Sequence, residues 1–145
     1  RGSMKSLVVD TNRIIAALVK DSVSRMILTA FLCTFFTVGF SKQEIIKHKE
    51  ELLEKTLLTE PAFDALLGTL YNRITILSDK ALQPHLEEAR HIMEAVDPDD
   101  VEFIAASLAI RCDGIWSDDK HFQKQSRVKV WTTEALLREL FAEKD

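Results

Sequence analysis

The chain of 145 residues has few cysteines, prolines and glycines, and no long hydrophobic run. Its two cysteines, Cys33 and Cys112, are far apart and form no Cys-x-x-Cys pair, so we expect buried, reduced thiols rather than a zinc site. With four glycines and no Gly-x-Gly-x-x-Gly, dinucleotide binding is disfavoured. The longest apolar stretch, from Met26 to Phe40, is broken by threonines and falls short of the roughly 20 residues of a membrane helix.

The chain also lacks an excess of positive charge, because 19 Lys and Arg face 23 Asp and Glu, a net charge of −4. This balance disfavours a nucleic-acid binder that works by charge alone. It does not exclude an enzyme that binds phosphate through a metal ion and nearby Lys or Arg side chains. Two basic clusters are present, and each taken alone is typical of a solvated face. The first is Lys42, Lys47 and Lys49, and the second is Lys120, Lys124, Arg127 and Lys129.

The first three residues, Arg1-Gly2-Ser3, stand before Met4 and resemble the remnant of an expression tag. We expect residues 4–145 to form a single domain, since this length is enough for one hydrophobic core. No secretory signal precedes the first strand pattern, and we therefore expect a cytoplasmic protein.

Short apolar runs alternate with helical patterns along the whole chain. The expected strands are 7–9, 35–40, 74–77, 114–116 and 128–131. The expected helices are 13–19 (capped by Thr11 or Asn12), 22 to 31 or 32, 41–55, one from Pro61, 84–95, one starting at 97–99, and one from Thr132 or Thr133 to 140. Ser41 and Glu44 have the spacing of a capping box. This alternation predicts an α/β fold, a three-layer α/β/α arrangement with a central parallel sheet of about five strands.

Acidic residues stand at four points of this pattern. In an open parallel sheet, ligands bind beyond the carboxyl ends of the strands, so we expect these acids to converge on one edge. Asp10 follows the first strand; Glu44 lies in the first turn after the second; Asp97, Asp99 and Asp100 begin the helix before the fourth; and Asp118 and Asp119 follow the fourth.

Carboxylates held close together raise one another's pKa and destabilise a fold unless a cation lies between them. Mg²⁺ or Mn²⁺ would fill this place, because both prefer oxygen ligands and retain water molecules for phosphate chemistry. Each acid also has a structural interpretation. Asp10 could be a helix N-cap, Glu44 half of the capping box, the acids at 97–100 helix-start residues, and those at 118–119 a polar turn. Their joint occurrence favours the metal site.

Four segments in this order resemble the PIN domain family. They are Val8-Val9-Asp10-Thr11-Asn12, a later helix acid, Asp97-Pro98-Asp99-Asp100 with Ile104, Ala105 and Ala109, and Ile115-Trp116-Ser117-Asp118-Asp119-Lys120-x-Phe122. The resemblance covers Lys5 to Leu140. It implies a metal-dependent nuclease, similar to the ribonuclease toxins of prokaryotic toxin–antitoxin pairs, with strand order 3-2-1-4-5.

The resemblance also implies a site that holds one or two Mg²⁺ or Mn²⁺ ions. Its catalytic and metal-binding acids would be Asp10, Glu44, Asp100 and Asp119, with Asp97, Asp99 and Asp118 as alternative ligands. Thr11, Asn12 and Ser117 would shape the pocket, and Lys120 would contact the substrate. Arg13 departs from the apolar residue usual at its place, and we expect it to face either substrate or solvent. His48 and His121 are either proton-transfer groups or surface histidines.

The reaction implied is hydrolysis of an RNA phosphodiester, leaving a 5′-phosphate and a 3′-hydroxyl. Asp→Asn at position 10 or 119 should preserve the fold, weaken metal binding and raise metal-free thermal stability. The expected partners are RNA, a small antitoxin protein and a second copy of the chain, docked through helices between 41 and 71. The alternative is a non-catalytic module that binds RNA or an antitoxin. A haloacid-dehalogenase-like phosphatase is disfavoured because Asn12 stands where that family has a second Asp, and a receiver domain because Asp10 follows no acidic pair.

Overall fold

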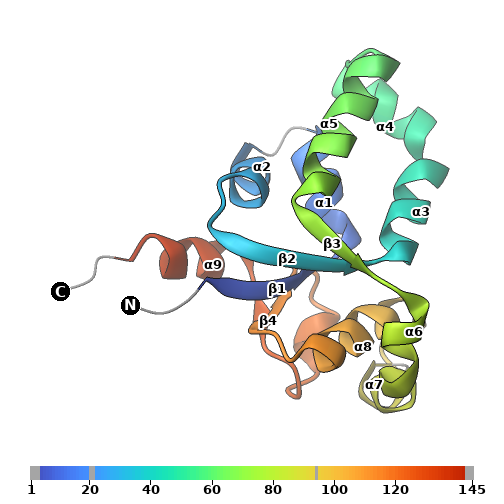
Figure 1. Cartoon of the computed structure of the whole chain (residues 1–145), viewed down its shortest axis with the longest axis vertical. Coiled ribbons are helices and arrows are strands. Elements are labelled where there is room, and N and C mark those ends of the chain that lie inside the picture. The colour runs from blue at the N-terminus through green and yellow to red at the C-terminus, as the bar shows by residue number, and fades with distance from the viewer. Residues whose placement is uncertain (1–3, 20–21, 94, 143–145) are drawn as a thin grey trace.

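A central sheet of five parallel strands in the order β3-β2-β1-β4-β5 organises the molecule (Figure 1). The computed structural model describes residues 4–19, 22–93 and 95–142, so the expected tag remnant at 1–3 lies outside the described residues. The strands are β1 (Lys5–Val9), β2 (Cys33–Val38), β3 (Ile74–Leu77), β4 (Gly114–Trp116) and β5 (Val130–Trp131). This order confirms the fold class predicted from the sequence.

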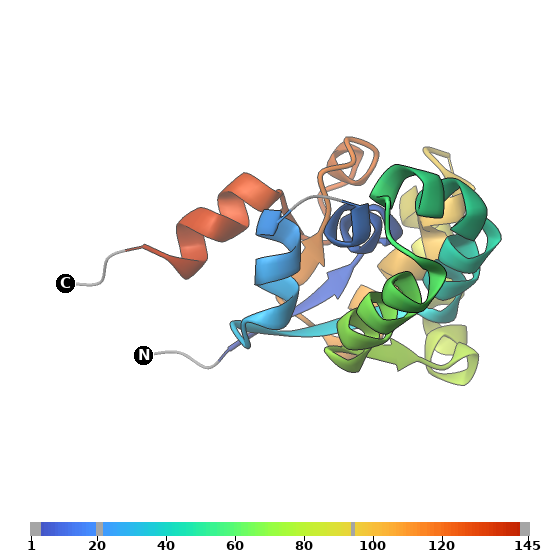
Figure 2. The same ribbon diagram turned by 90° about the horizontal axis from the view of Figure 1, so that it is seen from above.

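Helices cover both faces of the sheet and make the expected three layers (Figure 1). One face carries α1 (Thr11–Val19), α2 (Ser22–Thr29), α3 (Gly39–Lys47), α4 (Lys49–Thr56), α5 (Glu60–Asn72) and α9 (Thr133–Leu140). The other carries α6 (Asp79–Leu82), α7 (Leu86–Met93) and α8 (Val101–Ile110), with short 3-10 turns η1 (Gln83–His85), η2 (Pro98–Asp100) and η3 (Phe122–Lys124). Figure 2 shows α9 beside α2 at one end of the molecule and helices α3, α4 and α5 at the other. These three helices are called the α3–α5 arm.

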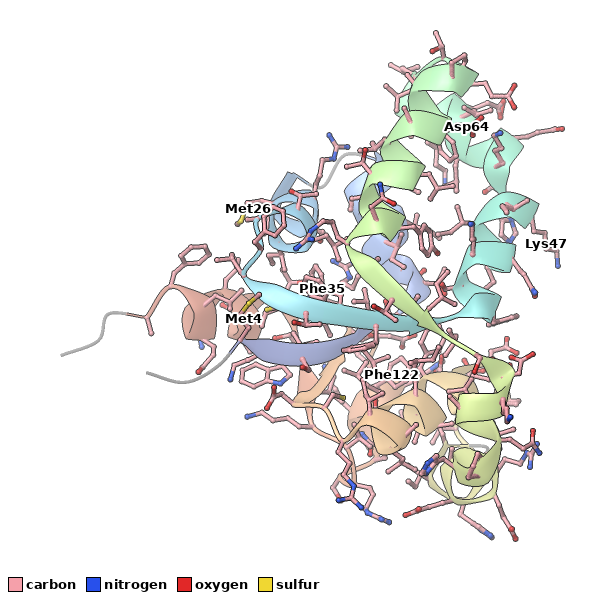
Figure 3. The ribbon with its side chains drawn as sticks, in the orientation of Figure 1. Met4, Met26, Phe35, Lys47, Asp64 and Phe122 are labelled. Atoms are coloured by element: carbon pink, nitrogen blue, oxygen red, sulfur yellow. The ribbon has the colours of Figure 1, made fainter. Side chains whose placement is uncertain are left out.

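The two hydrophobic cores follow from the alternation of side chains along each strand. In β1, Leu7 and Val9 belong to the core under α1, whereas Val8 belongs to the core under α8. Figure 3 shows Phe35 on the first side of the sheet and Phe122 on the second. Burial on both faces explains why these strands read as short, continuous apolar runs.

The register of β1 and β4 places the ends of these two strands at the same level. Val9 pairs with Trp116, and the backbone N–H of Asp10 donates to the carbonyl oxygen of Trp116 at 3.4 Å. Asp10 and Ser117, each one residue past its strand, are therefore neighbours. Both residues lie at the carboxyl edge of the sheet, where ligands bind in open parallel sheets.

The expected helix 41–55 is helical but starts earlier and is broken in two, and the expected capping box is wrong. Helix α3 begins at Gly39, and the helix is broken at His48, whose φ of −102° and ψ of 17° separate α3 from α4. Ser41 lies inside the helix, and its hydroxyl donates to the carbonyl oxygen of Val38 at 2.9 Å. Glu44 is consequently free of the capping role and points toward the sheet edge.

Other boundaries also differ from the predictions. Helix α2 ends at Thr29 because Phe31 takes a positive φ of 60°. The expected helix 84–95 corresponds to the end of η1 followed by α7, which stops at Met93, and α6 precedes it as a separate helix. Strand β2 begins and ends two residues earlier than expected, and β5 is shorter than expected. Asp10, rather than Thr11 or Asn12, caps α1, whereas the Thr132 cap of α9 is confirmed, with its hydroxyl accepting from Ala135 N at 3.1 Å. None of the described helices is long and apolar enough to cross a membrane.

Candidate metal centre

A cavity of about 260 Å³ opens at the carboxyl edge of the sheet, between the starts of α1, α3 and α8. It brings together all four acids assigned to the metal from the sequence, although they come from distant segments. Its lining is Asp10, Thr11, Asn12, Ile15, Phe40, Glu44, His48, Asp97, Asp99, Asp100, Phe103 and Asp119.

Asp10 forms the floor of this pocket and is only 4% exposed. One carboxylate oxygen accepts from the backbone N–H of Arg13 at 3.0 Å, which caps α1, and the other accepts from the hydroxyl of Ser117. Burial raises the pKa of Asp10 from its ordinary 3.8 to about 6, although these hydrogen bonds and the charge of Arg13 oppose the rise. Asp10 is thus fixed in orientation and costly to ionise without a cation.

Glu44 reaches the pocket from α3. The hydroxyl of Thr11, the first residue of α1, donates to Glu44 Oε1 at 2.8 Å. This bond ties the two helix starts together and orients the Glu44 carboxylate. Asn12 lines the same rim and is exposed, so its amide faces solvent at the pocket mouth.

Asp97 and Asp100 enter from the turn before α8. Asp97 Oδ1 accepts from the backbone N–H of Asp99 at 3.0 Å, which shapes the turn. Asp100 Oδ2 is buried and has no hydrogen-bond partner among the described residues. Burial, reinforced by the charges of Asp97 and Asp119, raises the pKa of Asp100 to about 7, despite the opposing effect of His121.

Asp119 completes the pocket from the segment after β4. Its backbone N–H donates to the Ser117 hydroxyl at 3.0 Å, and its Oδ1 accepts from the backbone N–H of His121 at 2.9 Å. The Ser117 hydroxyl therefore links Asp10 to the Asp119 backbone. Ser117 itself lies fully buried beneath the pocket.

Asp118 lies outside this pocket. Its two carboxylate oxygens accept from the backbone N–H and the hydroxyl of Thr133, at 2.7 and 2.6 Å, at the start of α9. Arg13 Nη1 lies 3.1 Å from Asp118 Oδ2, and the Arg13 side chain is 15% exposed. Contrary to both expectations, Arg13 therefore faces neither the pocket nor solvent. Lys120 is exposed and does not line the pocket either.

His121 is the residue whose position the sequence did not predict. Its Nδ1 lies 3.1 Å from Asp97 Oδ2, 3.7 Å from Asp119 Oδ1 and 3.8 Å from Asp100 Oδ2. The only signal in the sequence was its place two residues after Asp119. His48 lines the pocket but pairs outward, with Nδ1 3.6 Å from Glu51 Oε1.

The residues present fit a hard divalent cation. Asp100 supplies a buried oxygen without a hydrogen-bond partner among the described residues, and Asp10, Glu44, Asp97 and Asp119 line the same pocket. Ligand atoms of Asp97, Asp100 and His121 all lie within 4.8 Å of one another. Burial raises the pKa of Asp10 and of Asp100, and a bound cation would offset the cost of ionising both groups.

A protein-family model described as a PIN domain matches residues 8–141. The match covers all five strands from Val8 onward and includes every acid that lines the pocket. No match is found among curated proteins.

Proposed function

We propose that this chain, which belongs to the PIN domain family, is a metal-dependent endoribonuclease that hydrolyses RNA phosphodiester bonds at the carboxyl edge of its sheet. PIN domains are generally nucleases, so membership of this family supports a nuclease activity. The observation that carries the proposal is the buried, unpartnered Asp100 Oδ2 in a pocket shared with Asp10, Glu44 and Asp119. Burying such an oxygen costs free energy unless it binds a cation or a proton.

In this proposal Asp10, Glu44, Asp100 and Asp119 hold one or two Mg²⁺ or Mn²⁺ ions. When bound, such an ion makes water more acidic and neutralises charge on the phosphate. The protein's own contribution is orientation. The Ser117 hydroxyl aims Asp10, and the Thr11 hydroxyl aims Glu44, before substrate arrives.

One carboxylate would also accept the proton of the attacking water. Within the described residues Asp100 Oδ2 has no hydrogen-bond partner, which leaves this oxygen open to the ion or to the attacking water.

The substrate strand would cross the rim between α3 and the segment after β4. Lys42 and Lys47 are exposed on α3, and Figure 3 shows Lys47 projecting outward from that helix. Lys120 is exposed beside Asp119 on the opposite rim. Lys49, in contrast, is held 2.8 Å from Glu60 and from Asp64, so we leave it out of the RNA path.

The biological setting is a further proposal. The resemblance to toxin ribonucleases supports a role in a toxin–antitoxin pair, with a small antitoxin protein as partner. We also propose a homodimer formed through the α3–α5 arm. Ile46 and Leu57 on that arm are 56% and 91% exposed, which supports an apolar contact there.

The test is cleavage of a mixed, end-labelled RNA pool with Mn²⁺ or Mg²⁺, comparing the wild type with Asp10→Asn, Asp119→Asn and the matched control Asp118→Asn. We expect cleavage by the wild type and the control, abolished by chelator and by either pocket substitution. Equal cleavage by all four proteins would indicate a contaminating ribonuclease. Absence of cleavage by all, with no metal uptake in calorimetry, would favour the non-catalytic RNA- or antitoxin-binding module.

A further inference from the structure

The imidazole of His121 lies at the side of the acidic pocket, among carboxylates from two segments. Its Nδ1 approaches Asp97 Oδ2 at 3.1 Å, and it has Asp119 Oδ1 and Asp100 Oδ2 at 3.7 and 3.8 Å. The side chain is 44% exposed, so the ring is reachable from solvent and has no core packing to perform. A hydrogen bond between His121 Nδ1 and Asp97 Oδ2 holds the ring beside the acids of the pocket.

His121 Nδ1 and carboxylate oxygens of Asp97 and Asp100 are close enough to contact one cation, since these ligand atoms lie within 4.8 Å of one another. In an octahedral complex with bonds of about 2.1 Å, neighbouring ligand atoms lie about 3.0 Å apart and opposite ones about 4.2 Å apart. The separation of 3.1 Å from Asp97 Oδ2 is close to the first distance, and the separations of 3.7 and 3.8 Å lie between the two. A surface histidine that made one simple ion pair would need only the nearest of these carboxylates.

Backbone hydrogen bonds fix the two turns that carry these side chains. Asp119 Oδ1 accepts from the backbone N–H of His121, and Asp97 is held by its own bond from the backbone N–H of Asp99. The Asp97 carboxylate and the His121 ring are therefore positioned by separate turns, and their approach does not depend on a long flexible side chain.

We propose that His121 Nδ1, with Asp97 and Asp100, forms a mixed nitrogen–oxygen ligand set that selects Mn²⁺ over Mg²⁺ at this pocket. This inference rests on the proposed metal-dependent function and specifies which residues determine the metal preference of the pocket. Imidazole is a poor ligand for Mg²⁺, which prefers oxygen, and a better one for transition metals. Under this proposal Asp97 is a ligand as well as a turn-forming residue.

The experiment uses Mn²⁺ as the probe, without RNA. Mn²⁺ is added to the full chain in a nitrogen-free cacodylate buffer, and pulsed electron paramagnetic resonance detects modulation by a coordinated ¹⁴N nucleus. Calorimetry on the same samples gives the Mn²⁺ and Mg²⁺ affinities. The test variant is His121→Asn. The matched control is His48→Asn, because His48 lines the same pocket but pairs with Glu51.

We expect ¹⁴N modulation in the wild type and in His48→Asn, and its loss in His121→Asn. The Mn²⁺ affinity of His121→Asn should fall about tenfold or more, with a smaller change for Mg²⁺. Mn²⁺ uptake by the wild type without a nitrogen signal would overturn this inference and leave the carboxylate site intact. A signal that survives in His121→Asn would overturn it equally. No Mn²⁺ uptake by the wild type would overturn both the inference and the proposed function.

Discussion

Arg13 and Asp118 form an ion pair that joins the start of α1 to the start of α9, with Arg13 Nη1 3.1 Å from Asp118 Oδ2. Arg13 Nη1 also donates to the hydroxyls of Ser24 and Thr133 at 3.1 and 3.3 Å. The pair lies behind the pocket, on the face of the sheet that carries α1, α2 and α9. Asp118 thus ties the segment after β4 to the starts of α1 and α9.

Asp118→Ala should destabilise the protein by about 2 kcal/mol, because it removes hydrogen bonds to a charged group and leaves the mostly buried Arg13 guanidinium without its carboxylate. Urea unfolding measures the change. Arg138→Ala is the control, since its ion pair with Glu134 has both side chains 77% exposed and should contribute less than about 1 kcal/mol. Equal losses in the two variants would contradict this account of Asp118.

The neighbouring acids 118 and 119 should respond differently to neutralisation. Asp119→Asn removes a pocket carboxylate, and we expect Mn²⁺ affinity to fall by about tenfold or more. Asp118→Asn should leave that affinity unchanged, because Asp118 is bonded to Thr133 and Arg13 away from the pocket. Calorimetric titration with Mn²⁺ measures the affinity of both variants. A larger loss of affinity in Asp118→Asn than in Asp119→Asn would show that Asp118, rather than Asp119, binds the metal.

Stability without metal should fall as pH rises from about 4 to about 7. Burial raises the pKa of Asp10 to about 6 and that of Asp100 to about 7, so the folded state keeps protons that the unfolded chain has lost over this range. Above this range Asp10 and Asp100 are ionised in both the folded and the unfolded chain, so stability falls no further on their account. Melting temperature against pH, in chelator, measures the effect.

Asp100→Asn should flatten this pH dependence, since its amide needs no proton at neutral pH. Its metal-free melting temperature at pH 8 should therefore exceed that of the wild type by a few degrees. Asp99→Asn, in the same turn but exposed, is the control and should follow the wild-type curve. A wild-type melting temperature that rises between pH 5 and 7 without metal would contradict the predicted loss of stability with rising pH.

Gly114→Ala should be strongly destabilising. Gly114 opens β4 with a φ of +142°, and an added Cβ would meet the carbonyl oxygen of Lys129 at 2.5 Å, so we expect a loss of about 2 kcal/mol or more. Gly68→Ala is the control. Nothing lies within 4 Å of its added Cβ, and alanine in the middle of α5 should stabilise by about 0.5–1 kcal/mol. Denaturant unfolding compares them, and a neutral Gly114→Ala would refute the steric argument.

The order of elements was readable from the sequence because burial on both faces makes each strand a short apolar run. Leu7, Val8 and Val9 show this, since all three are fully buried although they face two different cores. The four segments shared with PIN domains supplied the strand order, and that order brings Asp10 and Asp119 to one edge. Helix boundaries were less predictable. Ser41 and Glu44 have good capping-box spacing, yet Gly39 already begins the helix.

The sequence by itself determined the parallel α/β sheet and the acids that would meet at its carboxyl edge, because these depend on hydrophobic periodicity and on topology. Only the tertiary structure decided between adjacent residues. Asp118 turns to Thr133 and Arg13 while Asp119 turns to the pocket, a difference set by local backbone direction after β4. The same holds for His121, because its distance to Asp97 depends on how two turns pack together, and no spacing along one chain encodes that contact.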